Sequence, residues 1–218
     1  WKCRRKIILD VAKGLAYLHE DCRQKIVHLD INPQNILLDE NYNAKVSDFG
    51  LSKLIDRNQN QVVTTMRGTP VYIAPEWLSS IITEKVDVYS FGVVLLEILC
   101  GRKNLDRSQP EEGMHLLSLF KKKAEEGLLL DIIDKSSEDM QSHGAEVVEM
   151  MKVAAWCLQT DFTKRPSMSV VVKVLEGVMD VECNLDYSFS TPPLPNRITE
   201  VGQDAATPLL PSVLSGPR

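Results

Sequence analysis

Apolar side chains recur at helical spacing through much of the chain. Between residues 5 and 20, Ile8, Val11, Leu15 and Leu18 fall on one face, with charged residues around them. This spacing of three or four residues predicts an amphipathic helix. The same spacing predicts further helices over residues 116–126, 145–158 and 168–179.

One segment, residues 84–100, is apolar on nearly all sides. Thr83 precedes it as a candidate N-cap, and Gly101 follows it as a stop. The segment is too short and, with Asp87 and Glu97, too charged to span a membrane. We therefore expect it to be the buried central helix of a mainly α fold.

Short extended segments lie between the first two predicted helices. Residues 25–27 read as a strand, and residues 36–38 and 44–46 form two apolar runs separated by a polar turn. The two runs predict a small hairpin. Such a hairpin would hold Asn35, before its first strand, and Asp48, after its second, against one site.

Two other segments lack regular apolar spacing. Residues 51–73 form a long irregular segment that contains Thr64, Thr65 and Thr69. Loops of this length are uncommon unless they are functional or disordered, so a phosphorylatable segment and a flexible loop both remain open. From residue 184 onward the chain is rich in proline, serine and threonine, which predicts a disordered tail over residues 184–218.

Composition excludes several classes of function. The formal net charge of −5, without a basic stripe, argues against nucleic acid as a partner. The five cysteines are far apart and include no C-x-x-C pair, which argues against a disulfide framework or a zinc site. No apolar run is long enough for a membrane span. The chain begins with Trp1, so we expect it to be a piece of a longer protein.

The strongest candidate chemistry lies in residues 28–35, His-Leu-Asp-Ile-Asn-Pro-Gln-Asn. Asp30 can accept a proton from a hydroxyl group, and Asn35 offers a neutral oxygen to a hard cation such as Mg²⁺. Acidic and amide residues also fill ordinary surface loops, so this octamer alone leaves both interpretations open.

The motifs that follow make the octamer far more specific. In order come Asp48-Phe49-Gly50, Gly68-Thr69-Pro70 and Ala74-Pro75-Glu76. Their order and spacing resemble the second half of a eukaryotic protein kinase domain. The sequence outside the motifs narrows the resemblance. The segment Gly14-Leu15-Ala16-Tyr17-Leu18-His19-Glu20, for example, is similar to plant receptor-like serine/threonine kinases of the S-domain (G-type lectin) branch.

The resemblance implies a role for each site residue. Asp30 would be the catalytic base, and Asn35 and Asp48 would be catalytic ligands that hold Mg²⁺ on the phosphates of ATP. Leu37 would pack beneath the adenine. Thr69 would line the channel for a protein substrate with a serine or threonine acceptor.

Other residues would be structural by the same resemblance. His28 and Phe49 would belong to a stacked apolar column, and Asp87 would hold the backbone of the catalytic loop. Arg165 would pair with Glu76. Residues 1–183 would be the large, C-terminal lobe of a kinase domain, with the catalytic loop at 28–35 and the activation segment at 48–76.

The chain departs from the kinase pattern in three places. Leu29 replaces an arginine, and Asn32 replaces the lysine that neutralises the γ-phosphate. No G-x-G-x-x-G motif and no strand lysine are present, so the small lobe that covers ATP is missing from this sequence.

Two hypotheses for function therefore remain. The first is a receptor-like serine/threonine kinase in signal transduction, on the cytoplasmic side of the plasma membrane. The second is an inactive lobe in the cytoplasm that binds partners, among them a kinase small lobe.

Overall fold

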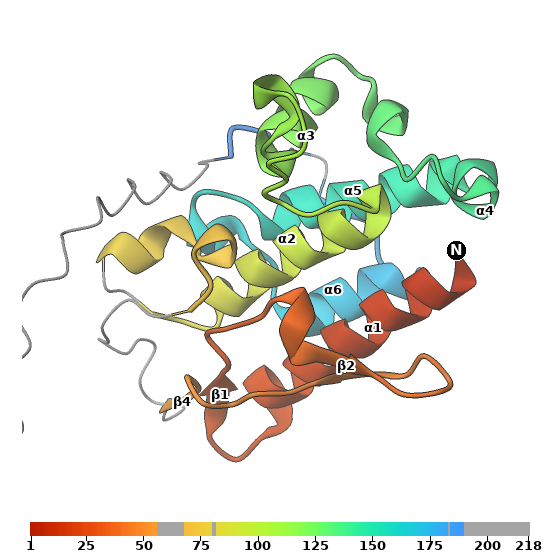
Figure 1. The fold of residues 1–218 in the computed structure, drawn as a ribbon. Coiled ribbons are helices and arrows are strands. Elements are labelled where there is room, and N and C mark those ends of the chain that lie inside the picture. The colour runs from red at the N-terminus through yellow and green to blue at the C-terminus, as the bar shows by residue number, and fades with distance from the viewer. Residues whose placement is uncertain (56–67, 80–81, 183, 190–218) are drawn as a thin grey trace, which may run out of the picture.

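Helix α2 (Lys85–Cys100) lies at the centre of the structure, a computed structural model that describes residues 1–55, 68–79, 82–182 and 184–189 (Figure 1). Nearly every residue of α2 is buried, as its apolar sequence predicts. The helix ends at Gly101, whose φ of 64° is left-handed, and the amide of Gly101 donates to Glu97 O. The amide of Lys85 donates to Oγ1 of Thr83 (3.2 Å), but the helix begins one residue later than predicted, and Glu84, not Thr83, occupies the N-cap position.

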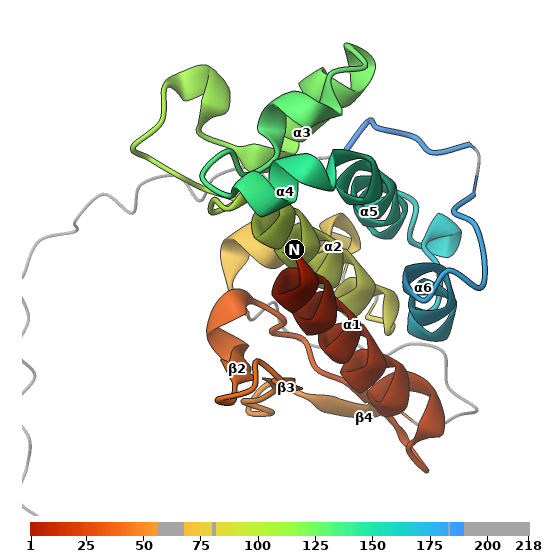
Figure 2. The same cartoon turned by 90° about the vertical axis from the view of Figure 1, so that its right-hand side faces the viewer.

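The other helices surround α2. Helix α5 (Gly144–Cys157) packs along one side of it, and α1 (Lys2–Ala16) packs on the other side, together with α6 (Met168–Leu175). A π-helix, Tyr17–Asp21, extends α1. Helix α3 (Leu116–Glu125) lies beyond α5 and α2, away from α1, whereas α4 (Glu138–Ser142) lies near the N-terminus, where its Asp139 contacts the amino group of Trp1 (Figures 1 and 2). The predicted mainly α fold is confirmed.

The strands form two antiparallel pairs at the edge of the helices, on the side of α1 (Figures 1 and 2). Strands β2 (Ile36–Leu38) and β3 (Ala44–Val46) form the predicted hairpin, with Ile36 opposite Val46. Strand β1 (Lys25–Val27) pairs with β4 (Lys53–Ile55). The hairpin lies against α1, which fixes its position.

The structure corrects three predictions about elements. The helix predicted over residues 168–179 ends at Leu175, because Gly177 adopts a left-handed conformation with a φ of 75°. Residues 53–55 were expected to be irregular but form β4, because pairing with a distant strand orders them. Helix α4 was not predicted, since one turn of helix carries little periodicity. Thr64 and Thr65 lie outside the described residues.

The end of the described chain folds back on α3. Phe189 is buried and stacks on Phe120 of α3 at 5.5 Å, and Tyr187 meets the same ring edge-on at 6.0 Å. These aromatic residues belong to the stretch that composition assigns to the tail. Short 3₁₀ helices connect the larger elements: Pro33–Asn35, Pro70–Tyr72, Pro75–Ser79, Glu111–Gly113, Leu129–Ile132 and Phe162–Lys164.

Candidate active site

The carboxylate of Asp30 joins the catalytic loop to the segment that follows Gly68. Its Oδ1 accepts hydrogen bonds from the amide (3.1 Å) and the hydroxyl (2.9 Å) of Thr69. Oδ1 also accepts from Nδ2 of Asn32 (3.0 Å), and Oδ2 accepts from Nδ2 of Asn35 (3.0 Å). The side chain is only partly buried, so it is fixed in direction and still open to solvent.

Asn32 stabilises this arrangement from beneath. The side chain is 2% exposed, and its Oδ1 accepts from the amides of Gln34 and Asn35, which caps the 3₁₀ helix Pro33–Asn35. Its Nδ2 donates to Asp30 O (3.1 Å), Asp30 Oδ1 and Thr69 Oγ1 (3.2 Å). Asn32 therefore occupies the position between Asp30 and Thr69 with a neutral group.

The hairpin brings Asn35 and Asp48 to one end, as the sequence predicts. Asn35 O accepts from the amide (2.9 Å) and the hydroxyl (3.0 Å) of Ser47, the residue before Asp48. Asp48 is exposed and has a φ of 61°, and its Oδ1 accepts from the amide of Gly50 (3.1 Å).

These two residues fit a hard cation. Both hydrogens of the Asn35 amide point at Asp30, to O and Oδ2, so the amide oxygen is left over, with no hydrogen-bond donor among the described residues. Carboxylate and amide oxygens on neighbouring elements are suitable ligands for Mg²⁺.

An apolar pair lies beside this end of the hairpin. His28 is buried, and Phe49 meets its ring edge-on with the centroids 5.0 Å apart. A ring nitrogen of His28 bonds Ser47 O (3.0 Å), which fixes the chain before Asp48. Phe49 remains 45% exposed and Leu37 of β2 56% exposed.

Asp87 holds the catalytic loop from the core. Its Oδ2 accepts from the amide of His28 (2.7 Å) and its Oδ1 from the amide of Leu29 (2.8 Å). Leu29 has a φ of 70°, a left-handed conformation that is unfavourable for leucine, and these bonds retain it. His19 completes the buried cluster through Nε2 (2.8 Å).

The sequence did not predict the structural roles of two residues, His19 and Gly68. Nothing in the sequence around His19 indicates its bond to Asp87. Gly68 has a φ of 113°, and a Cβ there would lie 2.9 Å from Leu29 O. A glycine is required because the segment passes close to the catalytic loop.

Arg165 and Glu76 form a buried bidentate ion pair. Nη1 and Nη2 of Arg165 lie 2.5 and 2.8 Å from the two carboxylate oxygens, and Arg165 is 2% exposed. Nε donates to Gln159 O (2.7 Å), and the guanidinium lies 5.0 Å from the centroid of the Tyr89 ring. The pair fixes the segment around Glu76 to the helical core.

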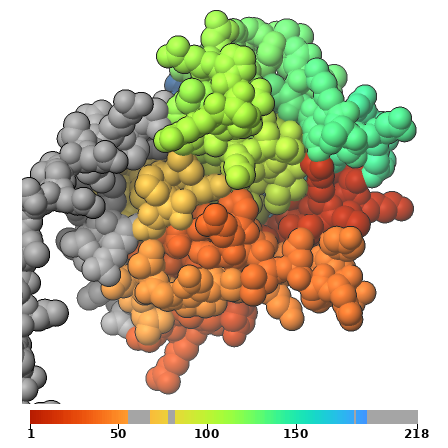
Figure 3. Space-filling model, in the orientation of Figure 1, coloured from red at the N-terminus to blue at the C-terminus, as the bar shows by residue number. Residues whose placement is uncertain are grey.

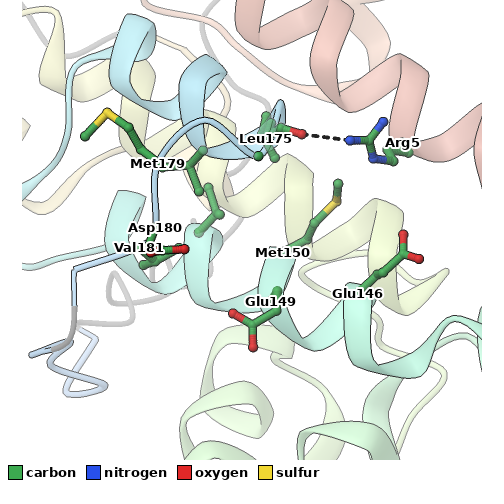
Figure 4. A pocket seen from close by; sticks show the side chains of 11 residues that line it. Arg5, Glu146, Glu149, Met150, Leu175, Met179, Asp180 and Val181 are labelled. Atoms are coloured by element: carbon green, nitrogen blue, oxygen red, sulfur yellow. Dashed lines mark hydrogen bonds between the residues drawn. The ribbon is translucent and has the colours of Figure 1, made fainter.

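A separate cavity of about 260 Å³ lies between α1, α5 and α6 (Figure 4). Its lining includes Met150, Met179 and three carboxylates, and Arg5 at its edge donates to Leu175 O (2.9 Å). None of the predicted site residues lines it. Within the described part of the chain, no helix has the length and apolar character of a membrane span.

Comparisons with known proteins identify the family of the chain. The protein kinase domain family matches residues 2–175. G-type lectin S-receptor-like serine/threonine-protein kinase SD2-5 of Arabidopsis thaliana is 56% identical over 83% of this chain. G-type lectin S-receptor-like serine/threonine-protein kinase LECRK4 of Oryza sativa subsp. indica is 45% identical over 81% of it. The chain spans 22% of the length of each of these relatives.

The family match covers the catalytic loop, the hairpin, the segment around Glu76 and the helical core that holds them. By this match, the chain belongs to the protein kinase family.

Proposed function

We propose that this chain is part of a receptor-like kinase that transfers the γ-phosphoryl group of ATP to serine or threonine hydroxyls of proteins. One observation carries the proposal: Asp30 is held between Asn35 on one side and Thr69 on the other. Phosphoryl transfer depends mainly on positioning and charge neutralisation, and this arrangement serves both.

Asp30 is the residue that orients the acceptor hydroxyl. Oδ2 accepts one hydrogen bond, from Asn35, while Oδ1 accepts three. Oδ2 accepts fewer hydrogen bonds than Oδ1, so Oδ2 is the oxygen with more capacity for a substrate proton. Thr69 lies next to Asp30 and would contact the acceptor residue.

Asn35 and Asp48 would hold Mg²⁺ through the free amide oxygen and the exposed carboxylate. A bound Mg²⁺ would neutralise charge on the ATP phosphates. Leu37, exposed on β2, would lie beneath the adenine. The exposed side chains of Leu37 and Phe49 support a partner on this face, which we take to be the kinase small lobe.

By this proposal, residues 1–183 are the large lobe and residues from 184 onward its tail. The names of the relatives SD2-5 and LECRK4 support a receptor-like protein, whose kinase domain would lie on the cytoplasmic side of the plasma membrane.

A second function is favoured by one observation. Asn32 is neutral at a position that faces the reacting phosphate in kinases, and it is fully used as a cap. An inactive lobe that binds protein partners would tolerate such a residue.

A chimera of this chain with the small lobe of SD2-5 separates the two functions. We expect Mg²⁺-dependent phosphorylation of serine and threonine peptides, strongly reduced by Asp48→Asn. Glu40→Gln, which removes an exposed carboxylate from the hairpin turn and is not a proposed ligand, should retain activity. Activity that is unchanged in Asp48→Asn would overturn the proposed metal ligands, and a folded, inactive chimera would favour the second function.

A further inference from the structure

A groove adjoins Asp30 on the side away from the proposed Mg²⁺ ligands. It has a volume of about 550 Å³ and is lined by residues 32–34, by Thr69 and the residues after it, and by the C-terminal end of α2 with the loop that follows. The three segments meet on the face shown in Figure 3, in orange, gold and light green. Asn32 and Thr69 belong to both the groove and the Asp30 site, so a peptide with its hydroxyl at Asp30 would continue into the groove.

The charged residues of this groove are Glu97, Arg102 and Lys103. Glu97 is not available to a ligand. It is 8% exposed, and its two oxygens accept from the hydroxyl of Tyr72 (2.9 and 3.0 Å) and from the amide of Asn104. Burial raises the pKa of the Glu97 carboxyl.

The two cations remain available. None of the ion pairs in the described part of the chain uses Arg102 or Lys103. Nη2 of Arg102 donates to Gly113 O, whereas its Nε is buried and has no partner among the described residues. Asp106 lies nearby, but its Oδ1 accepts from the amide and hydroxyl of Ser108. Lys103 is exposed.

We propose that Arg102 and Lys103 select acceptor segments that carry an anionic group close to the serine or threonine. The inference rests on the proposed function and adds a substrate class to it. A guanidinium and an ammonium that form no close ion pair among the described residues attract carboxylates and phosphates, and the partial burial of Arg102 strengthens its attraction. The anion is an aspartate, a glutamate or an already phosphorylated residue of the same segment.

Peptide binding to the 218-residue chain tests this without requiring catalysis. Three labelled peptides of equal length carry a central serine flanked by acidic residues, by their amides, or by one phosphoserine. By fluorescence anisotropy, the acidic or the phosphorylated peptide should bind at least about fivefold more tightly than the amide peptide. The difference should shrink when the ionic strength rises to about 0.5 M. Which of the two peptides gains assigns the source of the anion, and equal binding of all three would overturn the proposal.

Single substitutions test whether Arg102 and Lys103 cause the preference for anionic peptides. Arg102→Gln and Lys103→Gln should each remove most of the preference, whereas Lys173→Gln, on the exposed face of α6, removes the same charge and should retain it. If Arg102→Gln disturbs the fold of the loop after α2, the binding preference of Lys103→Gln still tests the proposal. A preference that survives Lys103→Gln and a folded Arg102→Gln would overturn the proposal.

The same peptides, used as substrates of the chimera, separate this inference from the proposed function. Selective binding without phosphorylation contradicts the function and leaves the inference standing. Phosphorylation with equal kcat/KM for all three peptides contradicts the inference alone.

Discussion

At the scale of single residues, Asn32 supports the structure of the loop but lacks the charge that the proposed reaction would use. It caps the 3₁₀ helix Pro33–Asn35 and bonds Asp30, but it brings no positive charge to the site. In the chimera, Asn32→Lys should raise kcat about tenfold, because a cation there stabilises charge in the transition state. The same change should lower the free energy of unfolding by about 0.5–2 kcal/mol, since the cap is lost.

Kinetic assays and thermal melts of Asn32→Lys measure the two effects separately. Ser167→Ala is a matched control, because Ser167 caps α6 far from the site. It should lower the melting temperature and leave kcat unchanged. An unchanged or lower kcat in Asn32→Lys would contradict the proposed position of the phosphates.

Buried supporting residues should differ from Asp30 in their effect on stability. Asp87→Ala and Arg165→Ala each leave buried partners without an ion or hydrogen-bond partner, at a cost of about 3–5 kcal/mol. Asp30→Ala should cost roughly 1 kcal/mol or less, because Asn32 and Asn35 retain Asp30 O as an acceptor. Chemical denaturation of the three variants measures these free energies of unfolding. Equal losses in all three would contradict the distinction between buried supporting residues and Asp30.

The parts of the candidate site that depend only on the spacing of residues along the sequence were predictable. Asn35 and Asp48 flank a hairpin whose apolar runs are visible in the sequence, so their meeting follows from local structure. The cap made by Asn32 and the bond from His19 to Asp87 were not predictable. Such contacts depend on side-chain directions that only the folded core determines.

At the scale of elements, Glu97 links α2 to the segment after Gly68 through Tyr72. Burial raises the pKa of Glu97 above its ordinary value of 4.5. The ionised form is therefore disfavoured in the folded state, and the stability that the neutral form contributes is lost as pH rises through the folded pKa. Relative to Glu97→Gln, the wild-type chain should lose stability as the pH rises from about 4.5 through the folded pKa.

Melting temperatures of both proteins across this range provide the measurement. Glu40→Gln, on an exposed turn, should show no such trend because its side chain stays in water. A difference between wild type and Glu97→Gln that is flat or grows with pH would contradict the burial of an ionisable carboxyl at this link.

The elements themselves were predictable in proportion to their length. Helices α1, α2, α3 and α5 follow from periodicity within a few residues, because three or more turns repeat the apolar spacing. Strand β4 and helix α4 escaped prediction, since each is too short to carry a pattern and depends on a neighbour for its order.

At the scale of the whole molecule, the face around Leu37 and Phe49 is open. Apolar side chains that a partner normally covers bind hydrophobic dyes, so the isolated chain should increase dye fluorescence or self-associate. The chimera should do so less. Leu37→Ser and Phe49→Ser should reduce the signal, whereas Val178→Ser, at a distant residue that is 70% exposed, should not. A monomeric, dye-silent chain would contradict a partner on this face.

The central claim is that Asp30 serves phosphoryl transfer. Its most direct test is one assay of phosphate transfer from labelled ATP to a serine peptide, applied to the isolated chain, the chimera, and the chimera with Asp30→Asn. We expect transfer by the chimera alone, because the isolated sequence has no glycine-rich loop to cover the phosphates and the variant lacks the base. Transfer by the isolated chain, or equal transfer by the Asp30→Asn chimera, would contradict the account.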